Sequence, residues 1–250
     1  MGAPHGLLQR CRNCSHLSSL WSCLFILLAD GDIRTYVSDM SEVLDNEEKA
    51  KGWRGSREVW LGAAREAFLD SGIDAVKIQP LANRLGLSRT SFYWFFEDRD
   101  AVLQALLDDW EATNTRRLVQ ASEAFAETIA EAALNVISVF LPGGGFVSRL
   151  DLAVRGWAHQ SDAVAATVIA TDEVRLSALR AMFERFGYAV DESDVRARTM
   201  YLVQIGYISM QVQEDLDLRL TRIPNYVKTF TGQAPTQSEL DRFHAQVHKG

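Results

Sequence analysis

Polar and basic side chains that could contact a nucleic acid gather in one short segment, SRTSFYW at residues 88–94. Guanidinium, hydroxyl and indole groups of this kind can hydrogen-bond to phosphate oxygens and to the edges of bases. Only side chains in the leading turns of a helix reach base edges in a major groove about 12 Å wide. We therefore ask which elements could present this segment at the start of a helix.

Patterns that support catalysis or metal binding are scarce. His159 stands alone, and His244 and His248 lie near the C-terminal end, in a half of the chain without cysteine. The chain has no GxSxG, P-loop or GxGxxG motif. We therefore predict a protein that is not an enzyme, with no catalytic residue, no cofactor and no metal site.

The cysteines lie at the N-terminal end, as Cys11, Cys14 and Cys23. With His16 they offer the four ligands of a structural zinc site, but their spacing matches no common zinc-binding pattern. Because the rest of the chain has no cysteine, it can form no disulfide, which favours a cytoplasmic location.

An apolar run at residues 20–29, LWSCLFILLA, resembles the core of a signal peptide. Ten residues are too few to span a bilayer as a helix, and no small-residue cleavage pattern follows. We favour the hypothesis that residues 1–39 are a non-native or disordered extension and that translation begins at Met40. We expect no membrane association.

Charge is unevenly distributed along the chain. The formal net charge is −7, which argues against a general polyanion binder. Between Lys49 and Arg99, however, nine basic residues oppose six acidic ones, so this segment carries +3 and the remainder −10. This asymmetry indicates one domain that faces an anionic partner and another with a different role.

Helical periodicity dominates from Ser56 onward, and no segment shows sustained two-residue alternation, so the predicted fold class is all-α. Ser56 can cap a first helix that ends at Gly72, and a short helix with Pro80 in its first turn ends at Gly86. By the same capping argument, Ser88 can start a third helix and Asp98 a fourth.

The C-terminal half shows longer helical patterns. We expect a helix from Phe125 to Phe140, ended by Pro142 and the glycines at 143–145. Two long helices follow: one ends at Gly187, and the other runs from about Asp194 through Val212. Their apolar stripes could pair with each other and with a second subunit.

This pattern predicts a domain order for the chain. After the extension come a flexible basic N-terminal arm at 40–55, a helix-turn-helix domain at 56–100 and a helical regulatory and dimerisation domain at 101–250. A small-molecule pocket in the last domain would be mostly apolar with a few polar groups. The candidates for its lining are Trp110, Trp157, Gln204, Tyr207 and Met210.

Residues 71–107, SGIDAVKIQPLANRLGLSRTSFYWFFEDRDAVLQALL, resemble the DNA-binding segment of the tetracycline-repressor (TetR) family of bacterial regulators. Agreement extends over about 50 residues, from Ser56 to Leu107. The features that carry it are Gly72, Leu81-Ala82, Gly86-Leu87-Ser88, Phe92-Tyr93, Phe96, Arg99 and Leu103.

The resemblance implies a role for each matching position. Arg89, Thr90, Ser91 and Trp94 would face the major groove, and Tyr93 and Arg99 would contact phosphates. Two positions depart from the family pattern: Lys77 stands where Thr or Ser is common, which removes a helix cap, and Phe95 where His or Tyr is common. The predicted DNA-binding set is Lys77, Ser88, Arg89, Thr90, Ser91, Tyr93, Trp94 and Arg99, with Arg54 and Arg57 in or beside the arm.

The function that this resemblance implies is a ligand-responsive repressor that binds a palindromic operator in double-stranded DNA as a homodimer. Its effector would be a small molecule that the sequence does not identify. A transcriptional activator or a ligand-independent regulator of the same fold is an alternative. From another class, an all-helical scaffold or enzyme without a DNA role is also an alternative.

Overall fold

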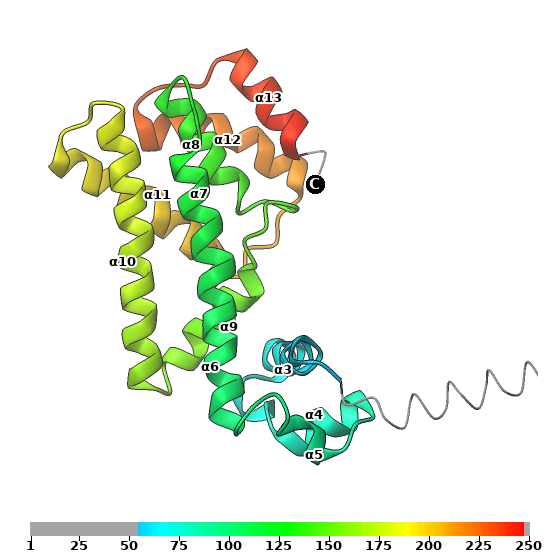
Figure 1. The fold of residues 1–250 in the computed structure, drawn as a ribbon. Helices are drawn as coiled ribbons and strands as arrows, with labels where there is room; N and C mark the ends of the chain where they lie inside the picture. The colour runs from blue at the N-terminus through cyan, green and yellow to red at the C-terminus, as the bar shows by residue number, and fades with distance from the viewer. Residues whose placement is uncertain (1–54, 248–250) are drawn as a thin grey trace, which may run out of the picture. The chain divides into compact units, whose positions relative to one another are not determined.

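The computed structural model describes residues 55–247, which are helical with no strand in that range. The predictions for residues 1–39, for the arm up to Arg54 and for the cysteines lie outside the described residues. In chain order the helices are α3 (Arg57–Ser71), η3 (Ile73–Ala75), α4 (Ile78–Leu85), α5 (Arg89–Phe92), α6 (Arg99–Trp110), η4 (Glu111–Thr115), α7 (Arg116–Glu123), α8 (Ile129–Ser138), α9 (Ser148–Ala158), α10 (Asp162–Arg185), α11 (Val190–Ser209), α12 (Leu216–Thr231) and α13 (Gln237–Val247) (Figure 1).

The ends of the N-terminal helices follow the predicted caps. The side chain of Ser56 accepts a hydrogen bond from the backbone N–H of Val59 at 3.3 Å, and α3 ends at Gly72 with a φ of 78°. The carboxylate of Asp98 accepts from the N–H of Ala101 at 2.8 Å and starts α6. These short polar side chains satisfy N–H groups that a helix start leaves without an intrahelical partner.

Aromatic packing holds α3, α4 and α5 together. Trp60 of α3 is fully buried and meets Phe92 of α5 edge to face, with ring centroids 5.4 Å apart. Phe92 stacks in turn on Phe96 at 5.5 Å. Leu81 and Ala82 complete this small core from α4. Edge-to-face aromatic contacts add directional preference to burial, so the orientation of the short helix α5 is fixed from beneath.

The helical segment that follows α5 has an irregular turn. Helices α6 and α7 form one continuous helical segment, interrupted by the π-helical turn η4. That turn places Asn114 and Thr115 in the interior, although both are polar. Asn114 exchanges hydrogen bonds with the backbone of Val147, donating at 3.3 Å and accepting at 2.8 Å. Single π turns of this kind often mark functional positions.

The expected bounds in the C-terminal half need correction. The helix predicted from Phe125 to Phe140 is shorter, because α8 spans Ile129–Ser138 and Phe125 lies outside it with 86% of its surface exposed. The last long helix begins at Val190 and ends at Ser209, so Val212 is outside it and exposed. Thr128 explains the start of α8: its hydroxyl caps the N–H of Glu131 at 3.1 Å.

Buried apolar side chains form two clusters. One joins α3, α4, α5 and α6 to the inner faces of α9 and of the start of α10; the other fills the space among α7, α8, α10, α11, α12 and α13. Helices α10 and α11 pack against each other as a hairpin in the second cluster. Helices α9 and α10 therefore connect the N-terminal helices α3–α6 with the large helical bundle of α7, α8 and α10–α13. The domain boundary at residue 100 stays a prediction.

None of the helices within residues 55–247 is both long enough and apolar enough to cross a bilayer.

The left-handed residue that ends α4 gives a test of the turn. Gly86 has a φ of +65°, where a β-carbon costs about 1–2 kcal/mol. We expect Gly86→Ala to lower the free energy of unfolding by about 1 kcal/mol, measured by urea denaturation. Gly62 is the matched control: it is exposed inside α3 with open space around it, so Gly62→Ala should raise stability by about 0.5–1 kcal/mol. Equal effects of the two changes would contradict this account of the turn.

Candidate nucleic-acid interface

A tight glycine turn separates α4 from α5. Gly86 adopts the left-handed conformation with its N–H directed at the carbonyls of Ala82 and Asn83, and the N–H of Leu87 also reaches the carbonyl of Ala82, at 2.9 Å. The chain can then reverse and start α5 at once, with Ser88 as its cap. Two short helices joined in this way form a helix-turn-helix, whose second helix can enter a major groove.

The serines at the start of α5 serve the protein's own structure. The Ser88 hydroxyl accepts from the N–H of Ser91 at 3.3 Å, and the two hydroxyls lie 2.8 Å apart. Ser91 is 6% exposed. The expectation that Ser91 faces outward is therefore wrong: Ser91 lies beside the buried Phe92 and is bonded to the Ser88 cap. Ser88 is exposed but acts as the cap.

Four side chains of the predicted set are exposed on α5 and on the turn that follows it, Arg89, Thr90, Tyr93 and Trp94, and are called here the exposed edge of α5. Tyr93 is 47% and Trp94 64% exposed, which is unusual for side chains of this size. The Arg89 guanidinium donates to the Tyr93 hydroxyl at 3.1 Å and lies 5.9 Å from its ring. This pairing holds a cation and a phenol together on one helical face.

Arg99 has an internal partner instead of a free guanidinium. Its Nε donates to the carbonyl of Val76 at 2.7 Å and its Nη2 to the carbonyl of Ile73 at 2.9 Å. These bonds tie the start of α6 to the segment that leads into α4. Two of its N–H donors thus position the helix-turn-helix, and the phosphate contact of Arg99 stays a prediction.

The remaining predicted contacts lie beside the edge or beyond the described range. Lys77 is exposed immediately before α4 and, as its side chain requires, makes no capping hydrogen bond. Arg57 is exposed at the start of α3, with its guanidinium 5.0 Å from the Phe96 ring. Arg54 lies outside the described residues. Lys77 thus adds an exposed cation at the start of α4, the first helix of the helix-turn-helix.

The helix-turn-helix segment matches a known protein family. Residues 61–106 fit the family model described as bacterial regulatory proteins, tetR family. Among solved structures the chain is similar to Salmonella enterica GusR, with a TM-score of 0.51 and 15% identity over 77% of this chain and 93% of that one. Mycobacterium smegmatis AmtR gives a TM-score of 0.50 and 20% identity, over 79% of this chain and 96% of that one. The curated proteins gave no match.

The helix-turn-helix and the matched segment define a DNA-binding transcriptional regulator. Residues 61–106 match the model of the tetR family of bacterial regulatory proteins, and the solved structures show that the chain shares their fold. This class of proteins acts by binding DNA and not as enzymes, in agreement with the scarcity of catalytic motifs in the sequence.

The five residues predicted to line a pocket do not come together. Gln204 and Tyr207 of α11 line a cavity of about 180 Å³, and Trp157 of α9 lines another of about 410 Å³. Trp110 is fully buried and lines neither of them; Met210 follows α11, is 78% exposed and also lines neither. The lining role thus stays a proposal for Gln204, Tyr207 and Trp157.

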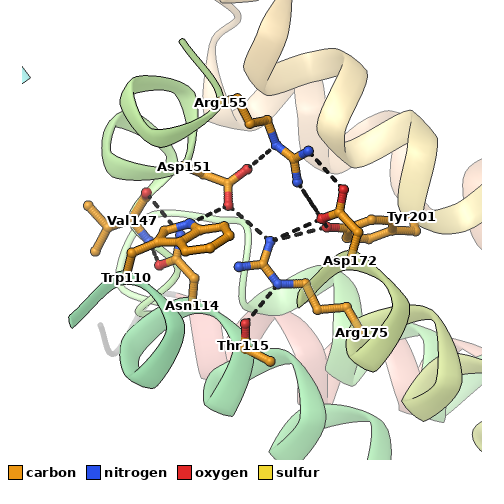
Figure 2. A network of polar contacts seen from close by, with 9 residues as sticks. All are labelled: Trp110, Asn114, Thr115, Val147, Asp151, Arg155, Asp172, Arg175 and Tyr201. Carbon is orange, nitrogen blue, oxygen red and sulfur yellow. Dashed lines mark hydrogen bonds and ion pairs between the residues drawn. The ribbon is translucent and has the colours of Figure 1, made fainter. Parts of the chain in front are cut away.

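Trp110 belongs instead to a buried polar network centred on Asp151 of α9 (Figure 2). One carboxylate oxygen accepts from Trp110 Nε1 at 2.8 Å and from Arg175 Nη1 at 2.9 Å, and the other accepts from Arg155 Nε at 2.8 Å. Asp151 and Arg175 are fully buried. An ion pair removed from water in this way needs its other polar atoms satisfied as well.

The network continues through Arg155 to α10 and α11. Arg155 binds both carboxylate oxygens of Asp172, at 2.7 and 2.9 Å, and the Tyr201 hydroxyl donates to Asp172 at 2.6 Å. Arg175 also reaches Thr115 of the π turn, through its Nε at 3.0 Å. Helices α6, α9, α10 and α11 and the turn η4 are thereby linked through charged and hydroxyl groups.

Arg175 holds its charge with incomplete hydrogen bonding. Its Nη2 is buried and has no hydrogen-bond partner among the described residues. The guanidinium lies 4.8 Å from the Trp110 ring and 5.4 Å from the Phe146 ring, so aromatic faces supply part of its stabilisation.

This network was not predicted from the sequence, although the sequence carries a signal for it. Thr171, Arg175 and Leu179 recur at a spacing of four on α10, so a charged residue stands on the stripe that faces the core. Asp151 stands in the same way between Leu150 and Val154 on α9. Charged residues on an apolar stripe predict a buried pair, but the pattern cannot say which partners meet.

Burial alone would raise the pKa of Asp151, but the guanidiniums of Arg175 and Arg155 and the hydrogen bonds from Arg155 and Trp110 outweigh it. The pKa of this carboxyl in the folded protein therefore lies below its ordinary value. Because the unfolded chain binds the proton more readily, the contribution of Asp151 to stability is present above about pH 4 and is lost as pH falls further.

We expect Asp151→Asn to lower the free energy of unfolding at neutral pH by about 3 kcal/mol, because the change removes the nearer and fully buried counter-charge of Arg175 and leaves only Asp172 at 4.0 Å. Urea denaturation across a pH series measures both this loss and the reduced dependence of stability on acid.

Asp194 is the matched control, since it also meets two arginines, Arg180 and Arg198, each at 2.9 Å or less, but lies at the surface. Asp194→Asn should cause a much smaller loss. A loss from Asp151→Asn no larger than that from Asp194→Asn would contradict the role given to the buried pair.

Proposed function

We propose that the protein is a homodimeric, ligand-responsive repressor, which acts in the cytoplasm on a palindromic operator in double-stranded DNA. The observation that carries the proposal is the exposed edge of α5, where Arg89, Thr90, Tyr93 and Trp94 project beyond a capped glycine turn. Aromatic and basic side chains at the leading turns of a second helix suit contacts with base edges and phosphates.

The separation of roles within α5 supports reading by direct contact. Arg89 can offer two parallel N–H groups to guanine, the commonest specific contact in the major groove. Tyr93 lies one turn further on, where its hydroxyl can reach a phosphate once Arg89 turns toward a base. Lys77 carries charge at the start of α4 and would serve the sequence-independent part of binding.

A second copy would dock on the outer face of α11. Val195, Thr199, Leu202, Gly206 and Ser209 recur at alternating spacings of four and three, which places them on one stripe. The stripe contains no charged residue, Val195 and Leu202 are 63% and 59% exposed, and the space beside Gly206 is open. A C2 dimer buries the same stripe from both copies and presents two α5 helices to half-sites about one helical turn apart.

Regulation would follow from coupling between the large helical bundle and the helix-turn-helix. An effector that favours one arrangement of the large helical bundle would change the separation of the two α5 helices and lower operator affinity. Linkage requires that operator DNA in turn weaken effector binding by the same factor.

Substitutions on α5 and before α4 should have different consequences for DNA binding. We expect Arg89→Ala to reduce the preference for operator over scrambled duplex by roughly tenfold or more, because base discrimination is lost. Lys77→Ala should weaken binding to both duplexes alike and lower the slope of log affinity against log salt by about one.

Fluorescence anisotropy over a salt series, with the intergenic DNA beside the protein's own gene and a scrambled duplex, measures both effects. Arg116→Ala is the control, because Arg116 is exposed at the start of α7, away from α5. Equal losses on both duplexes from Arg89→Ala would overturn its reading role. An unaltered protein that binds neither duplex would overturn the proposed function.

A charge placed on the α11 stripe should separate the dimer. We expect Leu202→Arg to give a monomer by light scattering and analytical ultracentrifugation and to weaken operator binding strongly, since the second half-site is lost. Ile169→Arg on α10 is the matched control, because Ile169 is 70% exposed but lies off the stripe. A dimer that survives Leu202→Arg, or that both changes disrupt, would contradict this interface.

A further inference from the structure

Two cavities meet along α9. The first, of about 180 Å³, lies among α9, α11 and α12, with Gln204, Tyr207 and Arg219 on its wall. The second, of about 410 Å³, has Phe68 of α3 and Trp157 of α9 on its wall. Arg149, Leu152 and Gln211 line both of them, so the two spaces adjoin. Together they reach the volume typical of a site for a small organic molecule.

The first cavity has a cation on its wall without a counter-ion. Arg219 donates to Gln204 Oε1 at 3.2 Å and lies 4.9 Å from the Tyr207 ring. Among the described residues, no carboxylate approaches its guanidinium within 4.0 Å. Burial removes hydrating water and lowers the pKa of Arg219 below its usual range. A half-buried guanidinium in this state gains from an anionic partner.

The other charged groups around the cavity also favour a negatively charged ligand. Arg149 is the second charged residue on the wall, and the lining includes no acid. The nearest acidic group, Glu214, is not part of the lining; one of its oxygens pairs with Arg222, and the other is buried without a partner among the described residues. Glutamines at 204, 211 and 213 supply amide donors. A cationic ligand would meet two arginines, of which only Arg149 has a carboxylate partner, Asp70 of α3.

We propose that these cavities bind a small amphipathic organic acid, whose carboxylate is held by Arg219 and whose apolar body runs along Leu152 toward Trp157. This inference rests on the proposed function and names the chemical class of its effector. The polar end lies between α11 and α12, and the apolar end lies between α9 and α3.

Such a ligand would contact α3, the helix that packs against α4 and α5. Phe68 and Leu69 of α3 line the second cavity, and Phe68 meets Trp157 edge to face at 5.9 Å. Arg149, shared by both cavities, also pairs with Asp70 of α3 at 3.4 Å. An anion beside Arg149 would compete with Asp70, while an apolar group beside Trp157 would displace Phe68. Both effects act on the helix that supports α5.

The test compares an acid with its uncharged counterpart of equal size: 4-phenylbutyrate and 4-phenylbutyramide. Calorimetric titration of the full chain should show that the acid binds at least about tenfold more tightly than the amide. Arg219→Gln should abolish this preference, and Arg219→Lys should retain part of it because the charge remains without the planar fork. Arg116→Gln, which removes an exposed arginine outside both cavities, should behave as the unaltered protein.

The outcomes separate the site from the proposed function. Equal binding of acid and amide, binding of neither, or a preference that survives Arg219→Gln would overturn the anion site. Circular dichroism verifies folding, and if Arg219→Gln does not fold, an undiminished acid preference in Arg219→Lys overturns it. An Arg219-dependent preference without any change in operator affinity would support the site and overturn the regulatory role. Loss of operator affinity on adding the acid, and not the amide, would support both.

Discussion

The buried contact between Asp151 and Arg175 is the constraint on which the arrangement of the large helical bundle depends. Asp151 belongs to α9, which packs on α3 and α6 as well as on α10 and α11. A buried ion pair is a poor source of net stability, because desolvation offsets its attraction. What it supplies is selectivity among arrangements: a shift of α9 along α10 would leave two full charges apart in the interior, at a cost that apolar packing alone would not impose.

The π turn is understandable from the same constraint. A regular helix through residues 111–115 would turn Asn114 and Thr115 to other directions, since the extra residue of a π turn rotates everything beyond it. In the observed turn the Thr115 hydroxyl accepts a hydrogen bond from Arg175. The Asn114 side chain accepts one from the backbone N–H of Val147, just before α9. The helical segment of α6, η4 and α7, which follows α5 in the chain, is therefore held against α9 by polar contacts that tolerate little displacement.

The sequence predicted the N-terminal helices well because their ends are coded locally. Ser56, Ser88 and Asp98 cap helices through contacts three residues away, and Gly86 takes a backbone conformation that other residues avoid. What failed there was the direction of side chains. Ser91 has the residue type of a DNA contact but is buried, and Arg99 bonds to carbonyls 23 and 26 residues earlier, which no local pattern encodes.

The site in the helical bundle was harder to foresee for the same physical reason. Gln204, Tyr207 and Trp157 were found by type, as polar and aromatic residues on apolar faces, but they belong to two cavities whose junction is set by Leu152 and Arg149. Trp110 has the same type and was assigned the same role. Its indole N–H instead donates to Asp151, which lies 41 residues later in the sequence and is brought close only by the packing of α9 on α6.

Both the cavities and the polar network lie along α9, on different faces of it, and this determines how a signal could travel. Leu152 and Trp157 face the cavities, while Asp151 and Arg155 face α10. A ligand that pushes on the first face cannot slide α9 freely, because the second face is held by charges that must stay paired. The motion with the lowest cost is therefore one in which α9 keeps its place on α10 and α3 moves relative to α9. Since Trp60 of α3 supports Phe92 of α5, that motion is passed directly to the exposed edge of α5.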